Sequence, residues 1–248
     1  MKPEISVVDL RKYFGEVKAV DGVSLEVNPK SIVSIIGPNG AGKTTLLNLV
    51  SGLIKPDSGR VYFRGRDVTG WSPAKLVKLG LARCFQISNV YDTLTVLDNV
   101  RAALHSVRRA AFSLKSTYYS IQSVNEKAKE VLELFNLWDK REKTPTELSH
   151  GDRKLLDIAI SYALAPKAML LDEPTAGMSI REKRRTVDVI KMLRDKLEVT
   201  VMLVEHDLDV VYEISDEVIV MHEGKVIARG KPEEIKRVQA VREVYLGE

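Results

Sequence analysis

The chain has a single cysteine, Cys84, among 248 residues, so no internal disulfide can form. That excludes a disulfide-stapled fold and suits a reducing compartment. Aromatic residues make up only 6% of the chain. No apolar run approaches the roughly 18 residues that a membrane helix needs, and residues 1–6 do not resemble a signal peptide. We therefore expect a chain that needs a partner for any task inside a membrane.

The excess of one charge sign over the other is also small. The chain holds 38 Lys and Arg against 34 Asp and Glu, which leaves a net charge of +4. This small excess does not call for a nucleic-acid partner, and none is expected. Hydrophobic residues make up 44% and charged residues 29%, as in ordinary globular proteins. For this length we expect one α/β domain with one inserted subdomain rather than two independent domains.

The most informative segment present is 37–44, Gly-Pro-Asn-Gly-Ala-Gly-Lys-Thr, a phosphate-binding loop. An apolar run at 31–36 predicts a strand before it, and 46–50 predicts a helix after it, which is the setting this loop requires. Its glycines let backbone N–H groups approach an anion, and the helix start adds further N–H groups and a positive dipole end. A ligand-free glycine turn is the alternative, which the complete motif disfavours. The predicted nucleotide-binding residues are Gly37, Pro38, Asn39, Gly40, Ala41, Gly42, Lys43, Thr44 and Thr45.

A second apolar run, 168–171, ends in the carboxylates Asp172 and Glu173. Asp172 is expected to hold Mg²⁺ directly or through water, together with the hydroxyl of Thr44. Glu173 is expected to polarise the water that attacks the γ-phosphate. Two acidic residues that merely close an edge strand are the alternative. Their position after a complete phosphate loop favours the catalytic interpretation.

Three further elements make nearly the whole chain resemble one family, the ABC ATPases. Leu148-Ser149-His150-Gly151-Asp152 is similar to the family's signature sequence, usually Leu-Ser-Gly-Gly-Gln. Gln86 matches its Q-loop glutamine, and His206, within Val-Glu-His-Asp, matches its H-loop histidine. The phosphate loop and the strand that ends in Asp172, which resembles the Walker B element, complete the set in the family's order and spacing.

The resemblance implies an α/β fold with a P-loop NTPase core of the RecA-like type, an antiparallel β subdomain and an inserted α-helical subdomain. The expected organisation is one ABC ATPase domain over 1–248. Its catalytic core would comprise about 1–86 and 155–248, and its helical subdomain about 87–154.

Apolar spacing predicts helices within the inserted region over 93–105 and 125–137, with Asn125 as the N-cap of the second. A charged helix is expected over 181–197. Pro232 is expected to open a last helix that runs to about residue 245.

The resemblance also implies individual roles. Phe14 is expected to stack on adenine, with Tyr13 as the neighbouring alternative. Gln86 is expected to reach Mg²⁺ or the attacking water and to join the core to the helical insertion. His206 is expected to bond a γ-phosphate oxygen and to hold the water. The predicted catalytic residues are Glu173, His206 and Gln86, and the predicted metal ligands are Thr44, Gln86 and Asp172.

Ser149 and the N–H groups near Gly151 begin a predicted helix over 154–163, which offers a second anion-binding terminus. In the family this terminus binds the γ-phosphate held by the opposite subunit. Two chains, identical or paralogous, are therefore expected to enclose two ATP molecules. Ser149-x-x-Asp152 is also a capping box, in which Asp152 could turn back to the Ser149 N–H. We predict that Asp152 faces away from the nucleotide. Ser179 stands where the family usually has aspartate.

The long stretch between Gln86 and Ser149, and Ala-Gly-Met at 176–178, are similar to the ATPases of branched-chain amino acid importers. The expected function is ATP hydrolysis, with ATP and Mg²⁺ bound, on the inner, cytoplasmic face of the cell membrane. The expected partners are separate permease subunits and, indirectly, a solute-binding protein. The alternatives are an ATPase for urea or lipopolysaccharide transport and a soluble ABC ATPase of the iron–sulfur assembly type. A P-loop kinase would have no use for the signature.

Overall fold

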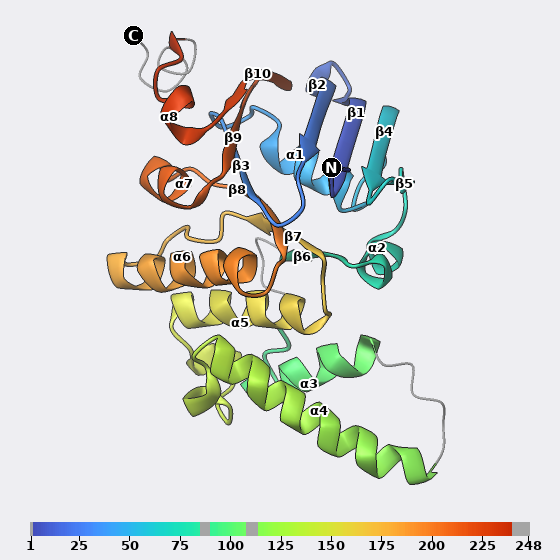
Figure 1. Cartoon of the computed structure of the whole chain (residues 1–248), viewed down its shortest axis with the longest axis vertical. Coiled ribbons are helices and arrows are strands. Elements are labelled where there is room, and N and C mark those ends of the chain that lie inside the picture. Colours follow the sequence, from blue (N-terminus) through green and yellow to red (C-terminus); the bar gives the residue numbers. More distant parts are fainter. Residues whose placement is uncertain (1, 85–89, 108–113, 240–248) are drawn as a thin grey trace.

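A six-stranded sheet forms the centre of the molecule, which is described by a computed structural model for residues 2–84, 90–107 and 114–239 (Figure 1). Its strand order is β10-β9-β3-β8-β7-β6. All neighbours run parallel except β10, which forms an antiparallel hairpin with β9. The strands β3, β7 and β8 are buried along their whole length, as expected for parallel strands covered on both faces. The six are β3 (Ile32–Ile36), β6 (Leu81–Cys84), β7 (Ala168–Asp172), β8 (Thr200–Val204), β9 (Glu217–His222) and β10 (Lys225–Gly230).

The register of these parallel strands aligns their carboxyl ends. Asp172, the last residue of β7, lies opposite Val204, the last residue of β8. Val204 also lies opposite Ile35 near the end of β3. Segments that leave β3, β7 and β8 therefore start at the same edge of the sheet, where open α/β sheets bind their ligands.

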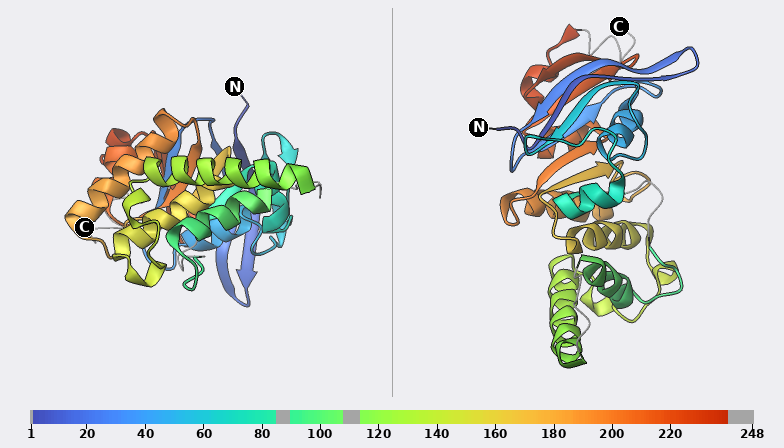
Figure 2. Two further views of the ribbon diagram at one scale, coloured as in Figure 1. Left: turned by 90° about the horizontal axis from the view of Figure 1, so that it is seen from below. Right: turned by 90° about the vertical axis from the view of Figure 1, so that its right-hand side faces the viewer.

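An antiparallel sheet lies beside this centre, at the upper right of Figure 1 and the top of the right-hand view in Figure 2. Its order is β2-β1-β4-β5, formed by β1 (Ile5–Phe14), β2 (Val17–Val27), β4 (Ser58–Phe63) and β5 (Arg66–Asp67). One apolar cluster joins both sheets to α1 (Lys43–Val50), with Phe63, Ile35 and Leu47 all fully buried in it. The helix α2 (Pro73–Leu79) follows β5.

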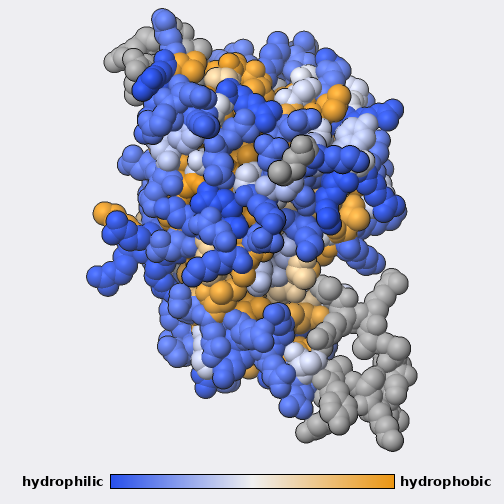
Figure 3. Space-filling model, in the orientation of Figure 1, coloured by the Kyte–Doolittle hydropathy of each residue, from blue (hydrophilic) through white to orange (hydrophobic). Residues whose placement is uncertain are grey.

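Helices cover the other face of the central sheet and extend below it (Figures 1 and 2). A second apolar cluster, which includes Leu132, Leu156 and Leu171, packs α4 and α5 against β7. On the face drawn in Figure 3, hydrophilic residues dominate. Among the described residues, no helix combines the length and apolar character that crossing a bilayer requires. The elements are α3 (Val96–Val107), α4 (Leu114–Leu134), the 3-10 turns Trp138–Lys140 and Pro145–Glu147, α5 (His150–Ala163), α6 (Ile180–Asp195), α7 (Leu208–Ile214) and α8 (Pro232–Ile235).

The predicted α/β fold class is confirmed, but two helix boundaries differ from expectation. The helix expected to start at Asn125 starts at Leu114 instead, since 114–124 holds neither proline nor glycine to interrupt it. Asn125 is therefore an internal residue of α4 and not its N-cap, and its Oδ1 accepts from Arg101 Nε at 2.8 Å. The last helix ends at Ile235, after which Val238 N bonds three residues back, as in a 3-10 turn. The part of that expected helix from 240 to about 245 lies outside the described residues.

Candidate active site

The loop between β3 and α1 is shaped by close backbone neighbours. A Cβ added at Gly37 would lie 2.1 Å from the Met221 carbonyl oxygen, and one at Gly42 would lie 2.0 Å from that of Ala19. Gly40 has open space around it but adopts a left-handed φ of 82°. Residues 37 and 42 are therefore restricted to glycine by space, and residue 40 is favoured as glycine by conformation. The result is a narrow loop whose backbone can approach an anion.

The Lys43 ammonium folds over this loop. Its Nζ donates to the carbonyl oxygens of Gly37 at 2.8 Å and Pro38 at 2.9 Å, and the residue is only 5% exposed. Burial lowers the pKa of Lys43, while the charges of Glu173 and Asp172 act in the opposite direction. Both carboxylates thus lie close enough to influence the ammonium.

Asp172 is buried at the end of β7, and its two carboxylate oxygens have different surroundings. Oδ2 accepts from the Arg83 guanidinium at 3.0 Å, while the same guanidinium donates to Asn48 Oδ1 in α1 at 2.6 Å and to Ser51 Oγ, directly after α1, at 2.8 Å. Oδ1 is buried and has no hydrogen-bond partner among the described residues. Burial raises the pKa of Asp172, and the charge of Arg83 opposes this.

Mg²⁺ fits these donors. It is commonly held by one or two carboxylates together with substrate phosphates and waters, rather than by a cage of protein ligands. The free Oδ1 of Asp172 is a hard oxygen ligand of this kind, and Thr44 is exposed in the first turn of α1. Within the described parts of the chain, no three or more His, Cys, Asp or Glu residues gather as a metal site.

Glu173 and His206 leave neighbouring strands and meet. Glu173 adopts φ 46°, in the left-handed region, and its N–H donates to Val204 O at 2.9 Å. Such a backbone conformation costs on the order of 1–3 kcal/mol in a residue other than glycine. His206 Nε2 lies 3.0 Å from Glu173 Oε1, and both side chains remain partly exposed. A carboxylate and an imidazole are therefore paired at the edge where the phosphate loop begins.

Glu205 is a site residue that sequence reasoning missed. The residue is 2% exposed. Oε1 of its carboxylate accepts from Thr175 N at 2.9 Å and Thr175 Oγ1 at 2.5 Å, and Oε2 from His206 N at 2.9 Å and Asp207 N at 3.4 Å. It thereby fixes the segment that carries His206 to the segment that follows Glu173. The available signal was a charged residue directly after a fully apolar strand.

Arg83 is a second missed residue. Its signal was a lone cation within the short apolar strand β6, where a charge needs a buried partner. The guanidinium connects β6 to Asp172 and to α1, so three segments of the core are tied together behind the phosphate loop.

The signature residues form a separate cluster where α5 and α6 begin. Ser149 is the N-cap of α5 and accepts from Asp152 N at 3.2 Å. Its hydroxyl donates to Glu182 Oε1 at 2.9 Å, and Gly151 N donates to the same oxygen at 3.2 Å. Glu182 Oε2 accepts from the N–H and the hydroxyl of Ser179, the N-cap of α6, at 3.1 and 2.8 Å. One carboxylate therefore joins both helix starts.

The capping contact between Asp152 and the Ser149 N–H does not form in the described part of the chain. Two cations hold the buried Asp152 carboxylate instead, namely Lys140 and, at 3.1 Å, Arg185. Full charges attract a carboxylate more strongly than a neutral amide does. Burial raises the pKa of Asp152, but hydrogen bonds and charges from Lys140 and Arg185 outweigh it, so the pKa is lowered overall.

Phe14 and Tyr13, the two candidates for stacking on adenine, lie in the antiparallel sheet. Phe14 ends β1, is 51% exposed, and has Lys12 Nζ 5.6 Å from its ring centroid. The alternative, Tyr13, donates its hydroxyl to Asp21 at 2.7 Å. Gln86 lies outside the described residues. Cys84 is buried, which raises its pKa, as expected for a small apolar side chain.

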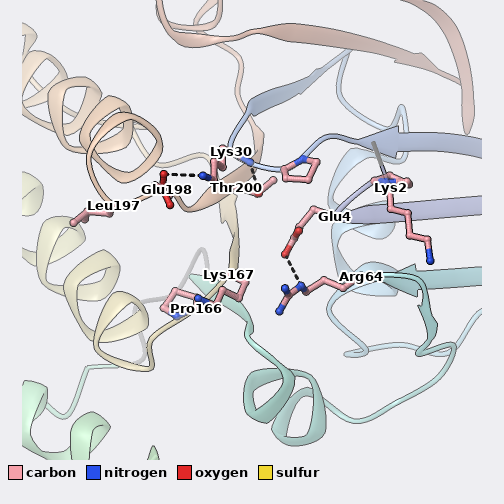
Figure 4. A pocket seen from close by; sticks show the side chains of 11 residues that line it. Lys2, Glu4, Lys30, Arg64, Pro166, Lys167, Leu197, Glu198 and Thr200 are labelled. Carbon is pink, nitrogen blue, oxygen red and sulfur yellow. Dashed lines mark hydrogen bonds and ion pairs between the residues drawn. The ribbon is translucent and has the colours of Figure 1, made fainter.

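A hollow at the opposite edge of the sheet is distinct from this site (Figure 4). It is lined by Lys30 and by Thr200, where β8 begins, so it lies at the amino ends of the strands. Lys30 pairs with Glu198 at 2.7 Å, and Arg64 pairs with Glu4 at 3.5 Å. Its charges are largely satisfied by one another.

The fold and this site define a class, the ATPases that carry an ATP-binding cassette. The chain belongs to the ABC transporter family, whose model matches residues 20–176. It is 38% identical over 246 residues to a probable branched-chain amino acid transport ATP-binding protein, LivG, of Methanocaldococcus jannaschii, covering 96% of this chain and 95% of the relative. It is 35% identical to the high-affinity branched-chain amino acid transport ATP-binding protein LivG of Escherichia coli K12, covering 100% and 99%.

Solved structures agree with this assignment. The chain is similar to the ADP conformation of MJ1267, an ATP-binding cassette of an ABC transporter, with a TM-score of 0.87, 34% identity and full coverage of both chains. It is also similar to the cassette MJ0796 in a dimeric post-hydrolysis state bound to ADP and Pi. That likeness has a TM-score of 0.79 and 28% identity, and it covers 92% of this chain and 98% of the other.

Proposed function

We propose that this chain is the ATP-hydrolysing subunit of an importer, that it binds ATP with Mg²⁺, and that it works as a pair of cassettes. The observation that carries the proposal is the meeting of the phosphate loop, Asp172 and the Glu173–His206 pair at one edge of the sheet. A nucleotide held by the loop would place its γ-phosphate toward the two carboxylates.

The chemistry follows from these positions. Lys43 and the loop N–H groups bind the β- and γ-phosphates, and the lysine exchanges its carbonyl partners for phosphate oxygens. Thr44, Asp172 and Gln86 would hold Mg²⁺, which neutralises charge on the phosphates. Glu173 takes a proton from the attacking water, and His206 orients Glu173 and donates to the developing charge.

Two supporting residues act through this set as positioning residues. Arg83 holds Oδ2 of Asp172, so that Oδ1 would be available to the metal. Glu205 fixes the backbone of His206 relative to Thr175. For adenine we propose Phe14 as the stacking side chain, since it is open to solvent while the hydroxyl of Tyr13 is held by Asp21.

The second cassette completes the site. We propose that Ser149 and Gly151 of one chain bind the γ-phosphate held by the other, which makes turnover depend on dimerisation. The dimeric state of the similar cassette MJ0796 supports this arrangement. The partner can be an identical chain or a paralogue.

Transport is the proposed use of this cycle. The relatives' names support branched-chain amino acids as the solute. The proposed partners are separate permease subunits and, indirectly, a solute-binding protein, with the chain at the inner, cytoplasmic face of the membrane. We propose that the region from about 87 to 154 is the helical subdomain, set between two core segments at about 1–86 and 155–248, and that Gln86 links it to the core.

Affinity purification of the tagged chain from membranes of its own cells tests this proposal. We expect multi-span permease subunits to co-purify and to stimulate ATP hydrolysis, and labelled leucine, isoleucine or valine to enter vesicles reconstituted with the complex. Co-purification of iron–sulfur assembly proteins alone would contradict the transport function. Uptake of urea but not of leucine would contradict only the proposed solute.

A further inference from the structure

The donors of the signature are already bound to an anion that belongs to the same chain. Glu182 Oε1 accepts from the Ser149 hydroxyl at 2.9 Å and from Gly151 N–H at 3.2 Å. These are the groups that the proposed function assigns to the γ-phosphate of the partner's nucleotide. A carboxylate oxygen and a phosphate oxygen are both anionic acceptors, so they compete for the same donors.

The hydroxyl cannot serve both anions. A serine hydroxyl has one proton to donate. Both acceptors within reach of Ser149 Oγ are carboxylate oxygens, Glu182 Oε1 and, at 3.2 Å, Asp152 Oδ2. A phosphate oxygen can accept from Ser149 only if the hydroxyl turns away from them.

Glu182 is also closely packed against the signature. A Cβ added at Gly151 would lie 2.8 Å from both Cγ and Oε1 of Glu182. The absence of a side chain at Gly151 therefore lets this carboxylate sit directly over the first turn of α5. Its second oxygen stays bound to Ser179 in the capping box of α6.

We propose that Glu182 is a further residue of the composite site: it holds the signature's donors while the cassette stands alone and releases them to the γ-phosphate when two cassettes close. This inference rests on the proposed function, because it requires the signature to bind the partner's nucleotide. Glu182 opposes closure in two ways, by occupying the donors and by placing a negative charge next to the incoming phosphate. Its removal strengthens ATP-dependent dimerisation.

Glu182→Gln is the matched substitution. Glutamine preserves side-chain length and is accepted in an N-terminal capping box, so α6 keeps its start when the amide oxygen stays with Ser179. The amide cannot accept at both ends, so the negative charge and the acceptor oxygen that faces Ser149 and Gly151 are lost together. The background is Glu173→Gln, in which the ATP-bound pair accumulates, and Glu130→Gln on the exposed face of α4 is the control.

The measurement is the ATP concentration at which half of the protein is dimeric, by sedimentation at fixed protein concentration and ionic strength. We expect Glu182→Gln to lower this concentration by about three- to tenfold, the range of one lost hydrogen bond. Glu130→Gln should leave it unchanged. Melting without nucleotide confirms that each variant is folded.

The outcomes distinguish a failure of the composite site from a failure of the role of Glu182. If the Glu173→Gln background forms no dimer with ATP, the composite site is wrong and this inference falls with it. If the background dimerises but Glu182→Gln leaves the half-point unchanged or raises it, the composite site stands and only the role of Glu182 is overturned. A purely structural role for Glu182 would raise the half-point.

Discussion

The two halves of the proposed composite site satisfy their own binding groups differently. In the phosphate loop, the Lys43 cation is held by two neutral carbonyl oxygens. In the signature, neutral donors of Ser149 and Gly151 are held by a full negative charge on Glu182. Both sets of hydrogen bonds involve a charged group and are therefore stronger than bonds between neutral groups. Only the Glu182 carboxylate places a like charge beside an incoming phosphate. We therefore expect the phosphate loop to bind nucleotide in a single chain, whereas the signature must first release Glu182.

The largest expected effect is on the chemical step at the half of the site that holds the phosphate loop. Glu173→Gln should lower kcat by about 10²–10⁴, the usual worth of a general base, while ATP stays bound and the dimer persists. Steady-state hydrolysis together with sedimentation in ATP measures both. Glu130→Gln is the control, and a variant that still hydrolyses ATP rapidly would remove Glu173 as the base.

Lys43→Ala tests binding in the same half. We expect ATP affinity of the single subunit to fall by about ten- to a hundredfold, since one charge-assisted contact to phosphate is lost. Calorimetric titration with ATP measures it, with Lys55→Ala as the control at an exposed site. Ser149→Ala should leave this single-subunit affinity unchanged and weaken only the dimer. Equal losses in both variants would contradict the division into two halves.

Glu205→Gln tests the support beneath His206. An amide cannot accept at both ends, so one of the bonds to Thr175 or His206 is lost and the imidazole is less firmly held. We expect kcat to fall by about three- to thirtyfold with KM for ATP little changed, on the scale of a buried hydrogen bond to a charge. Glu205→Asp should recover part of the rate, because the carboxylate is kept. A change in KM alone would argue for a different role.

The smallest expected effect concerns pH and the signature half. Hydrogen bonds from Ser179, Ser149 and Gly151 lower the pKa of Glu182 to about 2, from an ordinary value of 4.5. Its contribution to stability is present above pH 4.5 and is lost as the pH falls toward 2, because protonation then favours the unfolded chain. Thermal melting should show Glu182→Gln slightly below the wild type at pH 7, with the gap closing as the pH falls through that window. A gap that is independent of pH would contradict the ionised bridge.

The phosphate loop and the carboxylates after β7 could be predicted from the sequence because each is a local pattern in a local setting. Glycine, lysine and threonine follow one another directly at 37–44, and the apolar strands that precede both segments are unmistakable. Neither segment needs knowledge of distant contacts to be recognised. Their meeting at one edge depends on the parallel pairing of β3, β8 and β7, which the structure shows.

Glu182, Glu205 and Arg83 could not be assigned in this way, because each acts on residues far along the chain. Glu182 meets Ser149 across 33 positions, and Arg83 meets Asp172 across 89. Lys140 and Arg185, the two cations that bind Asp152, also lie outside the few residues that a helix-capping pattern covers. At Asp152, ion pairs formed in the tertiary structure outweigh the local helix-capping preference.

The back wall of the phosphate loop has a consequence for how spent nucleotide leaves. The turn between β9 and β10 is bonded to the loop through Gly224 N and Ala41 O at 3.1 Å, and to β2 through Asp21 N and Gly224 O at 2.8 Å. With Gly37 and Gly42 pressed against carbonyl groups as well, the cradle has no room to relax outward. In the proposed pair of cassettes, we expect product exchange to await the departure of the facing subunit, which would make the opening of the pair the timing element of each round.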